Sequence, residues 1–361
     1  MPADQLLIAL MAAFAVLGAA DKICGNRFGL GGAFESGIQA MGSLALAMVG
    51  IVCLAPVLAQ VLRPVVVPVF RVLGADAAMF AGAILACDMG GGALARELTG
   101  DARAAALGGV ITGSMLGATL VFTIPVAMGI LKEEDRPYMA KGILCGIVTI
   151  PVGVLVGGLV AGFPLAMVAR NLVPIVLLAV LIALGLWKAE RAMVRGFEVF
   201  GKGVAALSTV GLAAAILRAL TGLALIPGMA DIAEGFQTVG SIAIVLAGAF
   251  PLVAVLTRLL QKPLLAAGQK LGINETAAAG LIASLANSIA TFGMVKDMNP
   301  RGKVVNIAFA VSAAFVFGDH LGFTAGFAPE LLPAVILGKL TGGISAAAAA
   351  MLLTRNGTER S

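Results

Sequence analysis

Two short polar motifs interrupt strongly apolar stretches of the sequence, and their residue types are those that bind a small cation. Asp88 lies in ACDMGGG, and Asp319-His320 lies in FVFGDHLGF. A carboxylate inside a membrane costs about 2.5–3.5 kcal/mol on insertion scales, so it is a functional candidate by default. Either carboxylate can pair with an ammonium group, and His320 can bind a hydroxyl or relay a proton. We predict that Phe317 and Phe323 shield the bound cation through their ring faces.

Ordinary structural roles compete with these assignments. Asp88 also fits a polar cap at a broken helix, and His320 also fits a hydrogen bond between helices. Three further candidate substrate ligands are uncharged: Asn287, Ser114 and Ser312. Ser and Asn in membrane helices commonly hydrogen-bond to neighbouring helices, so the competing explanation is strong for them. We predict no catalytic residue, because Asp319 and His320 are neighbours and would point in different directions from a helix.

The composition identifies the class of protein. The chain has 361 residues, of which 60% are hydrophobic and only 12% charged, with a formal net charge of +5. A soluble domain carries about 25% charged residues, so soluble, disordered and nucleic-acid-binding proteins are excluded. The basic excess lies in short loops and fits the positive-inside rule. With one histidine, four scattered cysteines and no nucleotide-binding motif, we expect no cofactor and no metal site.

The apolar segments predict an all-α polytopic integral membrane protein with about ten to twelve transmembrane or re-entrant helices. No linker separates a second domain, so residues 1–361 are interpreted as one membrane transport domain with a short polar tail at 354–361. The expected segments are 5–20, 37–62, 77–99, 104–131, 138–162, 171–187, 199–223, 235–260, 275–298, 303–326 and 331–353.

The sequence matches itself at an offset of 198 residues. Residues 37–88 and 235–286 share 15 identities in 52 positions without a gap. The offset also pairs the two segments that polar residues interrupt, 77–99 and 275–298. Secondary transporters are commonly built from two such halves, with broken segments at the substrate site. We therefore predict two homologous halves, about 1–165 and about 171–353.

The orientation of the halves depends on whether the interrupted segments cross the membrane. If 77–99 crosses, the halves are parallel; if it re-enters, they are inverted. The distribution of Lys and Arg supports re-entry in the second half and opposes it in the first. We favour inverted repeats.

Four blocks of the sequence resemble one known family. They are FESGIQAMGSLALAMVGIVCLAPVLAQVL (34–62), MFAGAILACDMGGGALARELTG (79–100), GIVTIPVGVLVGGLV (146–160) and RGKVVNIAFAVSAAFVFGDHLGF (301–323). Together they are similar to the bacterial ethanolamine-utilisation permease family, EutH, over about residues 5–353. The resemblance implies a multi-pass protein of the bacterial inner (plasma) membrane that moves ethanolamine into the cytosol for catabolism. It assigns no residue roles.

Besides a purely structural membrane subunit, which the paired interrupted segments argue against, two other functions fit the same residues. One is an ion-coupled secondary transporter of another small polar or cationic solute. The other is a membrane-embedded enzyme, such as a lipid hydrolase that uses Asp319 and His320; we do not favour it, because these residues lie within apolar segments. The expected partners are ethanolamine and the lipid bilayer, with no nucleic acid. The sequence leaves the oligomeric state open, a homo-oligomer included.

Overall fold

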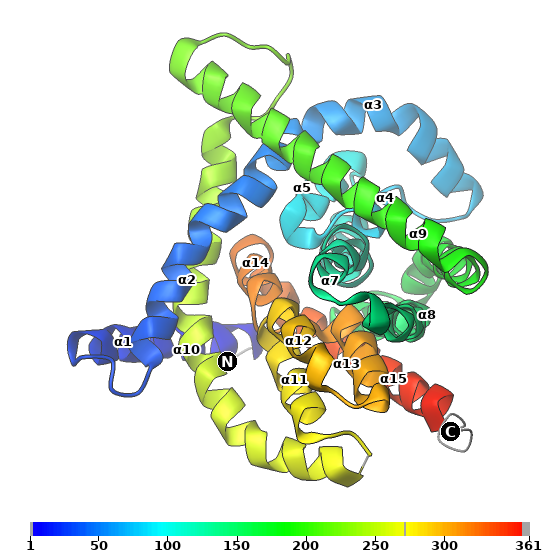
Figure 1. Ribbon diagram of the computed structural model, residues 1–361. Coiled ribbons are helices and arrows are strands. Elements are labelled where there is room, and N and C mark those ends of the chain that lie inside the picture. The colour runs from blue at the N-terminus through cyan, green and yellow to red at the C-terminus, as the bar shows by residue number, and fades with distance from the viewer. Residues whose placement is uncertain (1–2, 271, 356–361) are drawn as a thin grey trace.

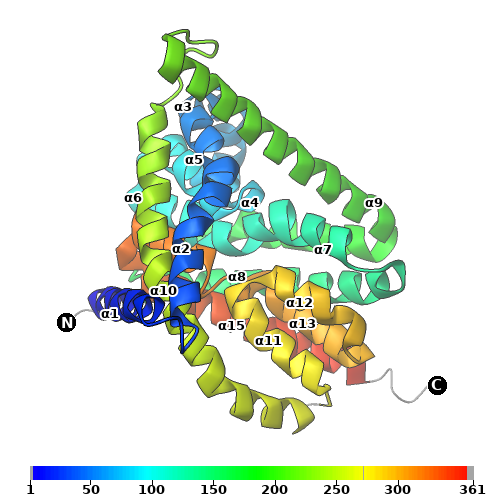
Figure 2. The ribbon, with the colours of Figure 1, turned by 60° about the vertical axis from the view of Figure 1, so that its left-hand side comes forward.

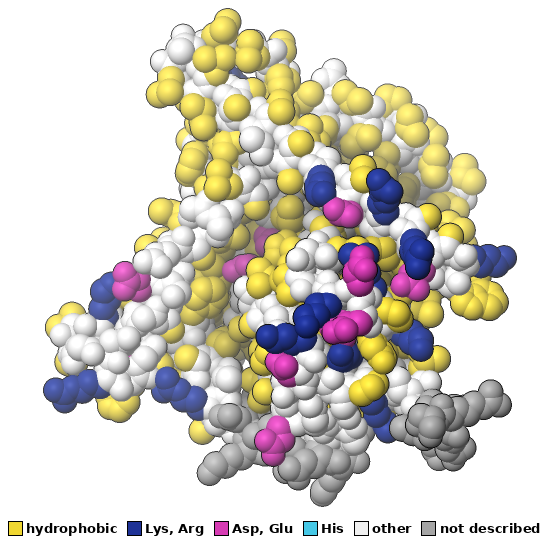
Figure 3. All heavy atoms as spheres, viewed as in Figure 1, with side chains coloured by type: hydrophobic (Ala, Val, Ile, Leu, Met, Phe, Trp, Pro, Cys, Tyr) yellow, Lys and Arg dark blue, Asp and Glu magenta, His cyan; other side chains and the backbone are white. Residues whose placement is uncertain are grey.

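A computed structural model describes residues 3–270 and 272–355, and every regular element in this part of the chain is a helix (Figure 1). Seven helical stretches among these residues are long and apolar enough to cross a membrane. Large apolar side chains such as Leu181 and Ile244 face outward, with 64% and 71% of their surface exposed. Charged side chains gather in the middle of one face, and apolar ones lie toward its outline (Figure 3). The protein is an all-α polytopic membrane protein, as the sequence predicts.

The N-terminal part of the chain contains two long helical runs that enclose a broken segment. The helices α2, η1 and α3 form one continuous run of 43 residues, and α6 to α7 form another of 29 residues. The elements are α1 (Ala3–Ile23), α2 (Leu30–Leu44), η1 (Ala45–Val49), α3 (Gly50–Val72), α4 (Ala78–Ile84), η2 (Cys87–Met89), α5 (Gly91–Leu98), α6 (Ala102–Ala105), η3 (Ala106–Gly117), η4 (Thr119–Thr123), α7 (Ile124–Ile130), η5 (Glu133–Asp135) and α8 (Arg136–Val160).

The C-terminal part begins with α9, which is two helices joined at a sharp bend. Ala189 has non-helical angles (φ −145°, ψ 49°), and the Met193 side chain packs back against Gly185. The expected segments 171–187 and 199–223 thus lie on either side of this bend. The elements are α9 (Leu165–Thr221), α10 (Ile232–Lys270), α11 (Glu275–Ala286), α12 (Ser288–Met294), η6 (Val295–Asp297), α13 (Pro300–Ala313), α14 (Asp319–Phe327), η7 (Pro329–Leu331) and α15 (Leu332–Arg355).

The interrupted segment 77–99 is a helical hairpin made of α4 and α5. The chain is extended at Leu85 and Ala86 and then turns at η2 into α5. The Thr99 hydroxyl at its end donates a hydrogen bond to the Asp76 carboxylate at its start, over 2.8 Å. The hairpin therefore enters and leaves at the same place.

The interrupted segment 275–298 has the same shape. The Thr291 hydroxyl of α12 donates to the Gly280 carbonyl of α11 over 2.9 Å, which a straight helix cannot do at this separation. At the open end, the Asn299 amide donates to the Asn274 side chain over 3.2 Å. The two broken segments are thus both hairpins.

Helix caps recur at the predicted offset as well. The Asp101 side chain accepts hydrogen bonds from the first turn of α6, and Asn299 caps α13 in the same way. The carboxylate of Asp76 and the side chain of Asn274 bind the first backbone amides of α4 and α11. The homology of the halves remains a prediction that these caps support. Of the predicted tail, residues 356–361 lie outside the described residues.

The run from α6 to α7 lies at the centre of the molecule. In its most apolar 18-residue stretch 83% of the residues are buried, against 17% for α1. Glycines let the first hairpin approach it: a Cβ on Gly117 would lie 1.9 Å from the Leu85 carbonyl oxygen. The two views show α2 beside α10 on one side of this central region (Figures 1 and 2). The first hairpin is therefore held against a buried helix, which fixes the position of its turn.

Candidate functional site

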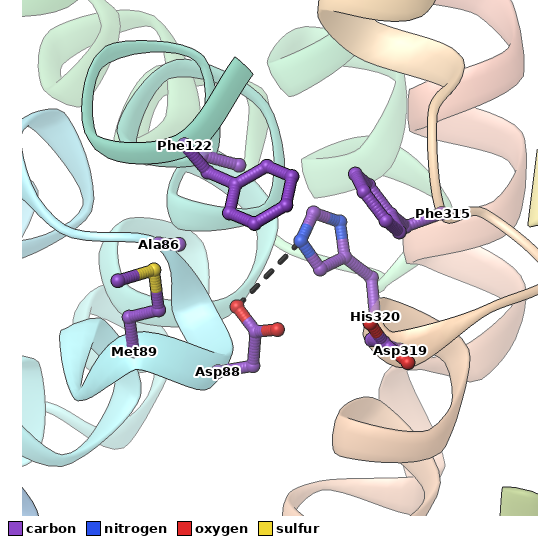
Figure 4. Close-up of a pocket in the computed structure, with 8 residues that line it drawn as sticks. Ala86, Asp88, Met89, Phe122, Phe315, Asp319 and His320 are labelled. Carbon is purple, nitrogen blue, oxygen red and sulfur yellow. Dashed lines mark ion pairs between the residues drawn. The ribbon is translucent and has the colours of Figure 1, made fainter. Parts of the chain in front are cut away.

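The two polar motifs meet at one cavity between the two parts of the chain. Asp88 reaches it from η2 of the first hairpin, and His320 reaches it from the first turn of α14 (Figure 4). The Asp88 carboxylate lies 3.6 Å from Nε2 of His320. The cavity is lined by Ala86, Asp88, Met89, Ala118, Phe122, Phe315, Asp319 and His320.

The local sequence explains the position of Asp88. Gly90 has φ 91°, a backbone angle that favours glycine, and this allows a tight turn directly after Met89. The Gly91 amide then donates to the Ala86 carbonyl over 2.9 Å and closes the turn. The glycines of ACDMGGG therefore form the turn that places Asp88 at the tip of the hairpin.

The second hairpin positions the other motif. Between α13 and α14 the chain leaves the helix, and its amides at Phe315 and Phe317 donate to the carbonyls of Ser284 and Leu285 over 3.1 and 2.9 Å. These carbonyls belong to the last turn of α11, near the break of that hairpin. The interrupted segment 275–298 therefore contributes to the site by holding the backbone that leads into Asp319.

Lys339 of α15 is a functional candidate that our sequence predictions omitted. Its side chain is 1% exposed, lies 3.0 Å from Nδ1 of His320 and donates to the Ser114 carbonyl of η3. An ammonium group only donates, so Nδ1 accepts and the imidazole proton sits on Nε2, facing Asp88. A charged side chain within an apolar segment is costly, and this is why Asp88 and Asp319 were selected. Lys339 is the single lysine of the apolar segment 331–353, so the same criterion could have identified it.

Asp319 is the second carboxylate of the cavity. Within the described residues its carboxylate makes no hydrogen bond or ion pair. Asp88, by contrast, faces His320, which in turn contacts Lys339. The cavity therefore presents one carboxylate that remains available for a cation.

Aromatic rings form another wall of the cavity. One is Phe315, which flanks the Asp319-His320 motif in the sequence, and the other is Phe122; the predicted Phe317 and Phe323 do not line the cavity. Phe122 of η4 and Phe315 are in edge-to-face contact with centroids 5.4 Å apart, and Phe315 lies 5.3 Å from the His320 ring. Phe317 packs instead into an apolar cluster around Met11, and Phe323 stacks on another ring. The sequence shows no feature that distinguishes Phe122 from the other sixteen phenylalanines.

The three uncharged candidates lie outside the cavity lining. Asn287 caps α12 by accepting from the Ile289 amide over 2.7 Å. The Ser114 hydroxyl donates to the Ile111 carbonyl, so only the backbone of Ser114 reaches the site, through Lys339. The buried Ser312 hydroxyl has no hydrogen-bond partner among the described residues. Their assignment as substrate ligands remains an untested prediction.

Three side chains that can bind a metal ion lie together near this cavity. Ligand atoms of Cys87, Asp88 and His320 lie within 4.8 Å of one another. A histidine that binds a metal usually donates its other ring N–H to a carboxylate or carbonyl. Here the other nitrogen faces the Lys339 ammonium. The arrangement fits an organic cation better than a metal ion.

The size of the cavity limits what it can hold. Its volume is about 30 Å³. A water molecule needs about 10–15 Å³ by the same measure. The cavity therefore suits a solute of a few non-hydrogen atoms in this conformation.

Comparison with known proteins assigns the family. The model of the ethanolamine utilisation protein EutH matches residues 3–353. A probable ethanolamine permease EutH of Listeria monocytogenes is 59% identical, covering 96% of this chain and 93% of its own. A protein of the same name from Escherichia coli is 46% identical, and an uncharacterized protein YxeR of Bacillus subtilis is 52% identical; each alignment covers 98% of this chain and 96% of the relative. No solved structure matches. The chain belongs to the ethanolamine utilisation protein EutH family.

Proposed function

We propose that the protein is a permease that carries ethanolamine across the bacterial inner membrane into the cytosol. Ethanolamine is a small molecule that is mostly protonated at neutral pH, with one ammonium and one hydroxyl group. The observation that carries the proposal is the cavity between the two parts of the chain, which has two carboxylates and two phenyl rings. Relatives named as probable ethanolamine permeases support the choice of solute.

The geometry gives each group a role. Asp319 pairs with the ammonium, because it is the carboxylate with no partner among the described residues. Asp88 accepts from the hydroxyl or from the ammonium, and the rings of Phe122 and Phe315 face the methylene groups and the charge. His320 is a positioning group, since both of its ring nitrogens already face other residues.

We further propose that the two halves form an inverted repeat in the membrane. Both broken segments are hairpins whose ends meet, so each would enter and leave on the same side. Five membrane crossings then separate corresponding elements, and an odd number reverses their orientation. Transport would proceed by movement of one half against the other around the cavity, as in other repeat-built transporters. We expect no catalytic activity.

The test is uptake of labelled ethanolamine by proteoliposomes that contain the purified full-length chain. We expect saturable uptake by the wild type and a strong loss on Asp319→Asn and on Asp88→Asn. Unchanged uptake in both variants would refute the assignment of the site, and no uptake by the wild type would refute the function. Repeating the assay with and without sodium and proton gradients separates facilitated diffusion from the ion-coupled alternative.

A further inference from the structure

We propose that Lys339 determines which solute charge the cavity accepts: it restricts the site to solutes with a single positive charge and excludes diamines. The proposal rests on the proposed function, since it concerns the selectivity of the same cavity. It adds a specificity-determining residue that does not itself line the cavity.

With both carboxylates ionised and Lys339 protonated, the formal charges around the cavity add up to one negative charge. Asp88 and Asp319 each contribute one negative charge, and Lys339 contributes one positive charge. His320 is formally neutral, because its Nδ1 accepts from the ammonium while its Nε2 carries the proton. Within the described residues, no lysine or arginine lines the cavity itself. A monocation therefore balances the site, and a dication does not.

The Lys339 ammonium group has a fixed position beside the cavity. Its ammonium is buried between the His320 ring and the Ser114 carbonyl, which belong to different parts of the chain. It thus acts through His320 on Asp88 as a tethered cation. A second positive charge on the solute would face Asp88, whose charge Lys339 already balances through His320, and it would be repelled by Lys339 in a poorly screened environment.

One pair of solutes separates the effect of solute charge from the effect of solute size. Ethanolamine and 1,2-diaminoethane have the same number of non-hydrogen atoms, so cavity size does not distinguish them. The uptake is measured at neutral pH, where ethanolamine carries one positive charge and a substantial fraction of the diamine carries two; a more acidic buffer is avoided because it would protonate the carboxylates of the site. The experiment measures uptake of both labelled solutes by proteoliposomes containing wild type, Lys339→Gln, or the double variant Asp319→Asn with Lys339→Gln.

We expect wild type to prefer ethanolamine by about tenfold or more, because an unbalanced charge in the site is poorly screened. Lys339→Gln leaves two negative charges and should shift this ratio toward the diamine by about tenfold or more. The double variant returns the site to one negative charge and should shift the ratio of the two uptake rates back toward ethanolamine, although uptake of both solutes falls because Asp319 is lost. The control is Lys202→Gln, which removes an exposed lysine of α9 (74% exposed) away from the cavity and should keep the wild-type ratio.

An unchanged ratio in folded Lys339→Gln, or the same shift in Lys202→Gln, would overturn the proposal. Wild type that transports ethanolamine and the doubly charged diamine equally well would also overturn it, and this comparison needs no variant that might misfold. Wild type that transports neither solute would instead refute the proposed function, so the two failures are distinguishable.

Discussion

The close approach of the central helix to the first hairpin predicts that one added methyl group will disable the site. In Gly117→Ala the new Cβ would lie 1.9 Å from the Leu85 carbonyl oxygen, whereas real Cβ atoms essentially never come closer than 3.0 Å. The backbone at Leu85 must therefore move by about 1 Å, at a cost of about 1–3 kcal/mol for overpacking. Asp88 follows Leu85 by three residues, so the turn that carries the carboxylate moves with it.

The effect on transport can be estimated from the contact that is lost. Binding geometry must be held within about 0.5 Å, so a shift of this size removes one hydrogen bond to a charged group. Such a bond contributes about 1.5–3 kcal/mol, which corresponds to a rise of about 10- to 150-fold in the apparent KM for ethanolamine. The assay is initial uptake by proteoliposomes, together with the thermal unfolding of the purified protein in detergent.

Gly129→Ala is the matched control on the same helical run. No atom lies within 4 Å of a Cβ at this position, so the substitution should leave KM unchanged and slightly raise the unfolding temperature. If Gly117→Ala transports with the wild-type KM and unfolds at the wild-type temperature, the packing of Gly117 on Leu85 does not position Asp88. The same KM shift in Gly129→Ala would equally refute the reasoning.

Two further predictions concern the rings and a remote ion pair. Phe122→Leu should raise the KM for ethanolamine by about 2- to 30-fold, because a cation–π contact is worth about 0.5–2 kcal/mol. Phe317→Leu lies outside the cavity and should change the KM less than twofold. If uptake kinetics show the reverse, Phe317 and not Phe122 contacts the solute. Asp135→Asn should destabilise the protein by about 3–5 kcal/mol, because it leaves the poorly exposed Lys303 ammonium without its carboxylate. Adding Lys303→Met should recover much of the lost stability, measured by thermal unfolding. If stability is not recovered, the unpaired Lys303 charge is not the reason for the destabilisation.

The sequence alone determined the class of protein and the two chemical motifs. A chain with 60% hydrophobic residues has too few charges to cover a water-facing surface, so a membrane fold followed from composition. Asp88 and the Asp319-His320 pair stood out because charge in an apolar segment is costly. Both motifs lie at the cavity, although they are more than 230 residues apart. The similarity of the four sequence blocks to the EutH family was confirmed by the family match.

Which other residues lie beside the two motifs is decided by tertiary contacts. Phe122 and Phe317 have the same chemistry and both lie near polar residues in sequence, but only the packing of η4 against the turn before α14 brings Phe122 to the cavity. Asn287 looked like a ligand because it breaks an apolar segment. That assignment stays an untested prediction. In the structure its side chain caps the helix that this break begins, while the hairpin's carbonyls hold the backbone before Asp319.

Lys339 shows both what the sequence reveals and what only the tertiary structure reveals. Its unusual place in an apolar segment is visible in the sequence, and burial of an unpaired charge is costly wherever it occurs. Its partners are not visible, because Ser114 and His320 lie 225 and 19 residues away and offer a backbone carbonyl and a ring nitrogen. Sequence patterns report which side chains are costly to bury, since that depends on residue type alone. Which of them compensate one another depends on helix crossings, and those are decided by the packing of the whole chain.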